Sequence, residues 1–161
     1  MYYLYVQKIH YKKVDTESMR GKCATFENAC REAGLRLTHQ RLEIYSELAD
    51  TPDHPTAETI YQRIRKKIPT ISLDTVYRTL ATFARHGLIN KVETVESQAR
   101  FEVKIMRHHH LTCRKCNKIT DFQWELLDDV NLPAEISRWG RVENKIVTVY
   151  GICGECMGND L

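Results

Sequence analysis

The sequence contains no long hydrophobic run. Charged residues interrupt every apolar cluster within a few positions, so no segment approaches the roughly 20 apolar residues that a membrane-spanning helix needs. The tyrosine-rich start, residues 1–6, is followed at once by Gln7 and Lys8, and therefore lacks the apolar region of a secretory signal. These absences exclude a membrane protein and predict a cytoplasmic location.

Glycine and proline are also scarce, with 7 and 4 among 161 residues, and no internal repeat or low-complexity stretch is present. With 42% hydrophobic and 28% charged residues, the chain can bury one modest core or two small ones, which excludes disordered and fibrous classes. The net charge is only +3. Residues 1–90 carry 14 Lys/Arg against 10 Asp/Glu, whereas residues 91–161 carry 10 against 11, so the first half is the better candidate for a nucleic-acid partner.

The first half of the chain shows helical periodicity. Helices are predicted from Cys23 to about Gly34, after an N-cap at Thr38, after an N-cap at Thr56 with its end near Pro69, and from an N-cap at Ser72 to about Gly87. The period then becomes two over residues 88–95 and 99–104, on either side of a turn at 96–98. Short helices followed by a hairpin predict a winged helix-turn-helix.

The fourth of these helices has two different faces. Its apolar side chains share one face: Leu73, Val76, Leu80, Phe83 and Ala84. Arg78, Thr82 and Arg85 lie on the opposite face. A basic exposed face suits the major groove of DNA, although an arginine on a helix is often an ordinary solvated side chain.

The second half is predicted to be a small α+β unit with strands at 108–112, 118–122 and 142–150 and a helix at 125–138. Three strands are few for independent stability, so a metal, dimerisation or both should support the unit. The predicted organisation is an N-terminal extension (1–22), a winged-helix domain (23–104) and a small metal-binding α/β dimerisation domain (105–161). The fold class is α+β.

Four of the six cysteines form two Cys-x-x-Cys pairs, Cys113 with Cys116 and Cys153 with Cys156. Each pair can hold one ion from a tight turn, and four thiolates complete the tetrahedral shell of a structural zinc. Without a signal peptide, this spacing favours a metal over disulfides. We therefore predict a structural Zn²⁺; a redox dithiol or four buried thiols are the alternatives.

A second group of metal-binding residue types surrounds a run of three histidines. His108 and His110 share one face of a strand, so both can hold one ion while His109 points away. The candidate donors are His54, Glu102, His108, His110 and Asp121. Mixed imidazole and carboxylate donors suit Fe²⁺ or Mn²⁺ better than a structural zinc. A solvated histidine run is the alternative, because spacing alone does not bring the five together.

Five motifs follow one another along the chain: GLRLTHQR at 34–41, HPTAE at 54–58, TVYRTL at 75–80, HHHLTCRKC at 108–116 and YGICGEC at 150–156. With these motifs the sequence resembles the ferric-uptake-regulator family of metal-dependent bacterial repressors. Together they span most of the chain, and their number and order make the resemblance specific. It implies a homodimer with a structural Cys₄ zinc and one regulatory metal between the two domains, held at the five donor positions above.

The resemblance also points to a branch of the family. The iron-responsive branch has Glu at both carboxylate positions of this site and the peroxide-sensing branch has Asp at both, whereas Glu102 and Asp121 mix the two. A further metal site of the family would draw on positions 107, 109, 128 and 145, but Arg107 and Lys145 cannot coordinate while charged. Asp121 and the missing site together favour a peroxide sensor.

In the peroxide-sensing branch, Fe²⁺ reacts with hydrogen peroxide and oxidises a ligating histidine, at positions that match His54 and His108. The modified ligand binds metal less well and the repressor leaves DNA, whereas Mn²⁺ supports DNA binding without this oxidation. The alternative within the family is an iron-responsive repressor without peroxide sensing.

DNA recognition is expected from two segments. By resemblance, Tyr77 and Arg78 enter the major groove, Arg36 reaches an A·T-rich minor groove and Arg41 contacts the backbone, while Thr75 is placed to contact bases. Two-fold symmetry of the homodimer implies an operator with inverted symmetry. Outside this family, the residues leave open a non-haem iron enzyme or a zinc-stabilised interaction module. We favour the repressor over an enzyme because no cofactor motif or separate general base is present.

Overall fold

The computed structural model describes residues 19–92, 94, 98–103, 107–142 and 144–158, with side chains described from residue 25 onward except at residue 137. These residues divide into two compact units, one within residues 19–103 and one within 107–158. Residues 1–18 of the predicted extension, the predicted boundary at 104–105 and most of the predicted turn at 96–98 lie outside the described residues.

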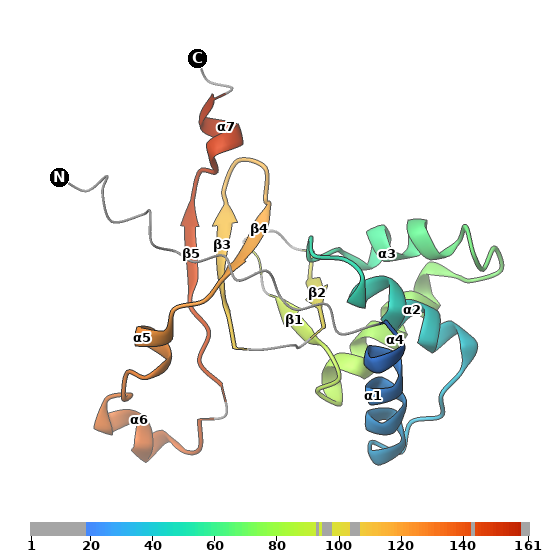
Figure 1. Cartoon of the computed structure of the whole chain (residues 1–161), viewed down its shortest axis with the longest axis horizontal. Helices are drawn as coiled ribbons and strands as arrows, with labels where there is room; N and C mark the ends of the chain where they lie inside the picture. Colours follow the sequence, from blue (N-terminus) through green and yellow to red (C-terminus); the bar gives the residue numbers. More distant parts are fainter. Residues whose placement is uncertain (1–18, 93, 95–97, 104–106, 143, 159–161) are drawn as a thin grey trace. The chain divides into compact units, whose positions relative to one another are not determined.

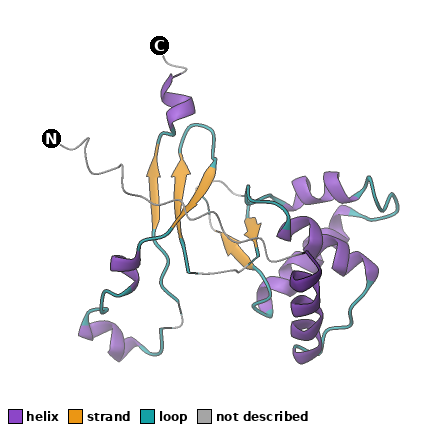
Figure 2. Ribbon diagram, viewed as in Figure 1, coloured by secondary structure: helices purple, strands orange, loops and turns teal. Residues whose placement is uncertain are grey.

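In its described residues the first unit consists of four helices and a hairpin, whose arrangement can be followed in Figures 1 and 2. Its helices are α1 (Met19–Glu32), α2 (His39–Ala49), α3 (Ala57–Ile64) and α4 (Leu73–Arg85). Strands β1 (Asn90–Val92) and β2 (Arg100–Glu102) pair in antiparallel fashion, with Lys91 opposite Phe101. This is the predicted order of a winged helix-turn-helix.

Side-chain caps fix where three of the helices begin. Thr38, Thr56 and Ser72 each accept a hydrogen bond from the backbone N–H three residues later, which satisfies one of the donors that a helix start leaves unpaired. All three caps were predicted. Gly34 and Gly87 follow α1 and α4 with φ of +67°, a left-handed conformation that favours glycine and ends the helix.

Other boundaries differ from the sequence prediction. Helix α1 begins at Met19, four residues before the predicted start at Cys23. Helix α3 ends at Ile64 rather than near Pro69, and a turn follows in which the backbone N–H groups of Lys67 and Ile68 both donate to the Ile64 carbonyl. The hairpin strands contain three residues each and are shorter than predicted.

The hydrophobic core lies in this first unit. It contains side chains from all four helices, the loops and the hairpin: Phe26, Cys30, Ile44, Tyr45, Leu48, Ala57, Ile60, Ile64, Ile71, Val76, Leu80, Phe83, Ile89 and Phe101. Phe26 stacks on Tyr45 with ring centroids 3.7 Å apart and meets Phe83 edge to face at 5.1 Å. Burial of this aromatic cluster anchors α1 to α2 and α4.

The second unit contains a three-stranded sheet and three short helices. In chain order these are β3 (His109–Cys113), β4 (Ile119–Phe122), α5 (Glu125–Asp128), α6 (Ala134–Trp139), β5 (Thr148–Gly151) and α7 (Gly154–Gly158). The strand order is β4-β3-β5, and β3 is antiparallel to β4 and parallel to β5. Figure 1 shows α7 beyond the end of β5.

The prediction of one helix over 125–138 was wrong. The structure has two short helices, because Pro133 supplies no N–H and disfavours helical geometry at Leu132. Two large apolar side chains of this region, Leu126 and Trp139, are 79% and 81% exposed in the single chain. Among the described residues, no helix is long and apolar enough to cross a membrane.

Candidate metal centres and nucleic-acid interface

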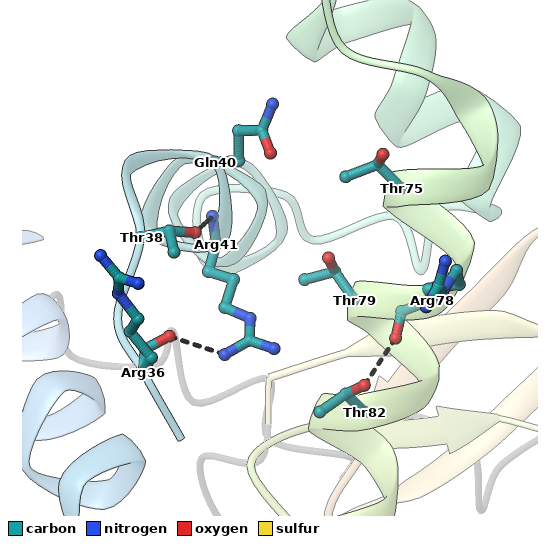
Figure 3. Close-up of a pocket in the computed structure, with 8 residues that line it drawn as sticks. All are labelled: Arg36, Thr38, Gln40, Arg41, Thr75, Arg78, Thr79 and Thr82. Carbon is teal, nitrogen blue, oxygen red and sulfur yellow. Dashed lines mark hydrogen bonds between the residues drawn. The ribbon is translucent and has the colours of Figure 1, made fainter.

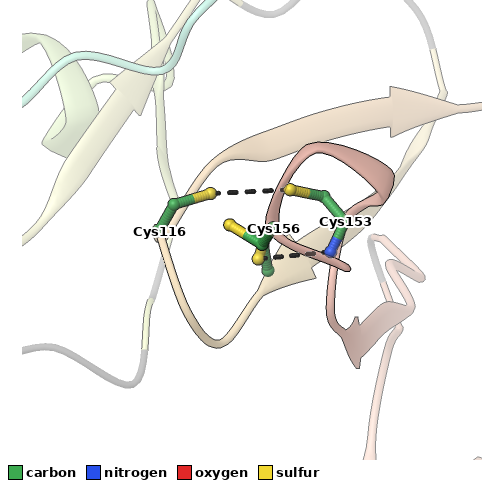
Figure 4. A group of neighbouring side chains, drawn as sticks. Cys116, Cys153 and Cys156 are labelled. Atoms are coloured by element: carbon green, nitrogen blue, oxygen red, sulfur yellow. Dashed lines mark hydrogen bonds between the residues drawn. The ribbon is translucent and has the colours of Figure 1, made fainter. Parts of the chain in front are cut away.

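The four cysteines of the two pairs meet at one end of the second unit (Figure 4). Parallel pairing of β3 with β5 places Cys113 beside Gly151, two residues before Cys153. Each cysteine offers a sulfur within 4.8 Å of the others, and Cys116 Sγ lies 3.7 Å from Cys153 Sγ. Cys116 is exposed, which argues against the reading as four buried thiols.

The backbone prepares this cluster for a cation. The N–H of Cys153 donates to Cys113 Sγ at 3.3 Å, and this bond together with the N–H of Cys116 lowers the pKa of Cys113 to about 6. The neighbouring Cys116 and Cys153 sulfurs raise the pKa of Cys156 to about 12. Sulfurs this close cannot all ionise alone, whereas a bound divalent cation stabilises four thiolates. The cluster therefore fits the predicted structural zinc.

His54 and Glu102 form a buried pair inside the first unit. His54 Nε2 lies 2.8 Å from Glu102 Oε2, and the two side chains are 3% and 9% exposed. The sequence placed Glu102 on the polar side of the hairpin, and the structure shows that this side is covered at β2. An imidazole and a carboxylate in a buried pair are donor types that suit Fe²⁺ or Mn²⁺.

The loop that carries His54 is held against β2. Thr56 forms a β-bridge with Arg100, and the N–H of Phe101 donates to the Pro55 carbonyl at 3.1 Å. His54 itself adopts φ of +48°, in the left-handed region that non-glycine residues rarely enter. The β-bridge and this backbone turn direct the imidazole toward Glu102.

Asn90 binds the other oxygen of the Glu102 carboxylate. Its side-chain amide donates to Glu102 Oε1 at 2.8 Å across the β1–β2 ladder, where Asn90 is the residue opposite Glu102. The sequence reasoning missed Asn90. The hairpin register was the available signal, because an amide opposite a carboxylate in an antiparallel pair lies within hydrogen-bond reach.

The remaining three predicted donors meet inside the second unit. His110 lies opposite Asp121 in the β3–β4 ladder, and Asp121 Oδ1 lies 3.6 Å from His110 Nε2 and 3.9 Å from His108 Nε2. The ring centroids of His108 and His110 are 4.9 Å apart. His109 projects differently, and its Nδ1 accepts a hydrogen bond from the Val147 N–H. This arrangement confirms that His108 and His110 share one face.

A basic groove lies between the start of α2 and the exposed side of α4 (Figure 3). Its lining residues are Arg36, Thr38, Gln40, Arg41, Thr75, Arg78, Thr79 and Thr82. No carboxylate is among them, and the Arg78 side chain is 82% exposed. Three guanidinium groups among hydroxyl groups suit a phosphate backbone.

Hydrogen bonds organise the groove. Arg41 Nη1 donates to the Arg36 carbonyl at 2.6 Å, so two of the predicted DNA contacts are joined. Thr82 Oγ1 donates to the Arg78 carbonyl. Thr79 and Gln40 were not predicted to take part. Thr79 could have been found from its spacing, since it lies one helical turn from Thr75 and Thr82.

Tyr77 lies outside this groove. Its side chain is half-exposed, and its hydroxyl donates a hydrogen bond to Glu58 Oε1 on α3. This bond lowers the pKa of Glu58 and raises the pKa of Tyr77. Tyr77 is therefore held as a donor by a neighbouring helix, and Glu58 is a further residue that sequence reasoning missed.

Residues 32–148 match the ferric uptake regulator family, which is most of the chain. The chain belongs to the ferric uptake regulator family. It is therefore a DNA-binding transcriptional regulator, of a family whose members act as homodimers, and not an enzyme. The predicted fold class, a winged helix followed by a small α/β domain, is confirmed.

Named members of the ferric uptake regulator family support the same assignment. The chain is 37% identical over 126 residues to the peroxide-responsive repressor PerR of Staphylococcus epidermidis, covering 78% of this chain and 84% of the relative. The Helicobacter pylori ferric uptake regulator, with three functional metal binding sites, aligns at a TM-score of 0.71 and 26% identity over 88% of this chain and 95% of its own. PerR of Streptococcus pyogenes aligns at a TM-score of 0.50 and 26% identity over 84% of this chain and 92% of its own.

Proposed function

We propose that this chain is a metal-dependent repressor that releases DNA when hydrogen peroxide oxidises one of its histidines. The observation that carries this proposal is the pairing of buried histidines with carboxylates, His54 with Glu102 and His110 with Asp121, in a chain 37% identical to a peroxide-responsive repressor. Because the protein would bind DNA, we propose that it acts in the cytoplasm.

The donors fit two different ions. Cys113, Cys116, Cys153 and Cys156 suit a structural Zn²⁺ because four thiolates leave no open position. The regulatory Fe²⁺ or Mn²⁺ would be held by His54 and Glu102 from the first unit and by His108, His110 and Asp121 from the second. Their nitrogen and oxygen donors support this assignment. Bound Fe²⁺ would catalyse the transfer of an oxygen atom from hydrogen peroxide to a ligating histidine, and Mn²⁺ would not.

Residues of the chain itself would be both the target of the oxidation and the switch that releases DNA. A carbon of the His54 or His108 imidazole gains one oxygen atom of the peroxide, and the other oxygen leaves as water. Glu102, fixed by Asn90, keeps His54 in place for this two-electron oxidation. An oxidised ring would be a weaker ligand, so the metal-dependent DNA-binding state would lose its stabilisation.

DNA would be read from the first unit. Arg78 and Tyr77 on α4 reach the major groove, with Thr75 beside them for base contacts, while Arg41 contacts the backbone and Arg36 an A·T-rich minor groove. The basic groove supports the parts given to Arg36, Arg41, Thr75 and Arg78, which line it, whereas Tyr77 lies outside it. Because the regulator acts as a homodimer, the operator would have inverted symmetry.

An iron-responsive repressor without peroxide sensing is the second candidate. Glu102 favours it, because a longer carboxylate at this position resembles the iron-responsive branch. The two solved structures do not separate these functions, since both are 26% identical to this chain.

The test is mass spectrometry of tryptic peptides after the protein is loaded anaerobically with Fe²⁺ or Mn²⁺ and treated with hydrogen peroxide. The peptide spanning residues 42–63 contains His54 but no Met, Cys or Trp, so one added oxygen is simple to assign. The peptide spanning 108–114 is fragmented to separate its histidines from Cys113.

We expect one added oxygen on His54 or His108 with Fe²⁺ and none with Mn²⁺, together with loss of DNA binding. The exposed His39, in the peptide spanning 37–41, is the internal control and should stay unmodified. If both site histidines remain unmodified while iron content is confirmed, peroxide sensing is wrong and the iron-responsive function stands.

A further inference from the structure

Lys145 forms an unusual set of contacts in the second unit. Its ammonium donates to three backbone carbonyls around the C-terminal end of α5, those of Leu127, Asp128 and Val130, the last two at 3.0 Å each. Carbonyls at a helix end have no partner within the helix and carry partial negative charge. One cation therefore closes the end of α5 and the turn after it.

A buried imidazole lies in the same region. The His109 side chain is 0% exposed, and its Nδ1 accepts a hydrogen bond from the Val147 N–H at 3.2 Å. The neutral ring must then carry its hydrogen on Nε2, which lies 3.7 Å from Asp128 Oδ1. No hydrogen bond to Nε2 exists within the described part of the chain.

Carbonyl oxygens, a carboxylate and an imidazole are together the donors of a divalent-cation site. The family resemblance implies such a site from positions 107, 109, 128 and 145, and the structure brings His109, Asp128 and Lys145 into one region. The residues present do not fit a metal there. Lys145 is itself a cation that already occupies the carbonyls, and Arg107 is an exposed guanidinium.

We propose that the Lys145 ammonium is a built-in cation that takes the place of a metal ion between α5 and the residues preceding β5. The positive charge that stabilises the second unit at α5 then belongs to the Lys145 side chain rather than to a bound ion. The chain binds metal at its cysteine cluster and its regulatory donors but not at this location. The proposal is independent of peroxide sensing, because it concerns neither set of ligands.

The test compares the wild-type protein with Lys145→Glu and Lys145→Met after saturation with Zn²⁺ and removal of free ions. Lys145→Glu supplies a third ligand beside His109 and Asp128 and should bind about one more zinc ion per chain than the wild type. Lys145→Met has similar length but neither charge nor oxygen, so it should gain no ion. Because Lys145→Met lacks the ammonium, its Tm should lie about 4–8 °C below that of the wild type.

Two results would overturn the proposal. One is anomalous scattering from zinc between His109 and Asp128 in crystals of the wild-type protein, a measurement that needs no variant to fold. The other is a Lys145→Met protein with unchanged Tm. If Lys145→Glu does not fold, Lys145→His offers the same gain of a ligand without a new negative charge.

Discussion

Replacing Asn90 by alanine tests whether a residue outside the donor set controls metal affinity. The amide donates to Glu102 Oε1 at 2.8 Å, while the other oxygen of that carboxylate faces His54. A hydrogen bond to a charged group contributes about 1.5–3 kcal/mol, and the part-buried position of Asn90 favours the lower end. Removing a residue that orients a ligand typically costs about 10- to 100-fold in metal affinity. We expect Asn90→Ala to raise, by that factor, the Mn²⁺ concentration needed for half-maximal DNA binding.

The assay is an anaerobic Mn²⁺ titration in which anisotropy of a labelled palindromic A·T-rich duplex reports DNA binding. Lys91→Ala is the matched control, because Lys91 is the next residue on β1 and its side chain is exposed. DNA affinity at saturating Mn²⁺ should be unchanged in both variants. A Mn²⁺ midpoint in Asn90→Ala equal to that of the wild type would refute the role given to Glu102.

Two further predictions concern the pH response and the zinc. The Tyr77–Glu58 hydrogen bond stabilises the fold at pH values above the ordinary carboxyl pKa of about 4.3, and this stability is lost as the pH falls through the lowered pKa of Glu58. It is lost a second time as the pH rises through the raised pKa of Tyr77, because the hydroxyl then gives up the proton that it donates. Tyr77→Phe should therefore raise the pKa of Glu58, measured by carboxyl NMR titration, and an unshifted titration curve would contradict the bond. Cys156→Ser should lose zinc and melt the second unit at lower temperature than the first, by calorimetry and metal analysis, because that unit has few buried apolar side chains. Met157→Ser, an exposed neighbour that is not a ligand, should retain its zinc.

Features set by neighbouring residues were predictable from the sequence. The caps at Thr38, Thr56 and Ser72 depend on a side chain and an N–H three residues apart, and the alternation of His108 and His110 depends only on strand geometry. The cysteine cluster was equally accessible, because two closely spaced pairs already define its ligands.

Features set by distant partners were not predictable. Glu102 has the pattern of an exposed strand residue, and only the loop at His54 covers it. In the sequence Lys145 resembles any surface lysine, and only the structure shows that its ammonium lies at the carbonyls that end α5. The break at Pro133 is the exception, because it follows from a single residue that supplies no N–H.

The separation of the zinc ligands along the chain sets an order of assembly during synthesis. Cys113 and Cys153 are 40 residues apart, so at about 5–20 residues per second the second pair follows the first by about 2–8 seconds. Every residue of the hydrophobic core precedes both pairs. The first unit can therefore fold during translation. The first Cys-x-x-Cys pair, in contrast, cannot complete a four-thiolate zinc site until the second pair has been synthesised. Zinc capture is thus a late step in the biogenesis of this regulator.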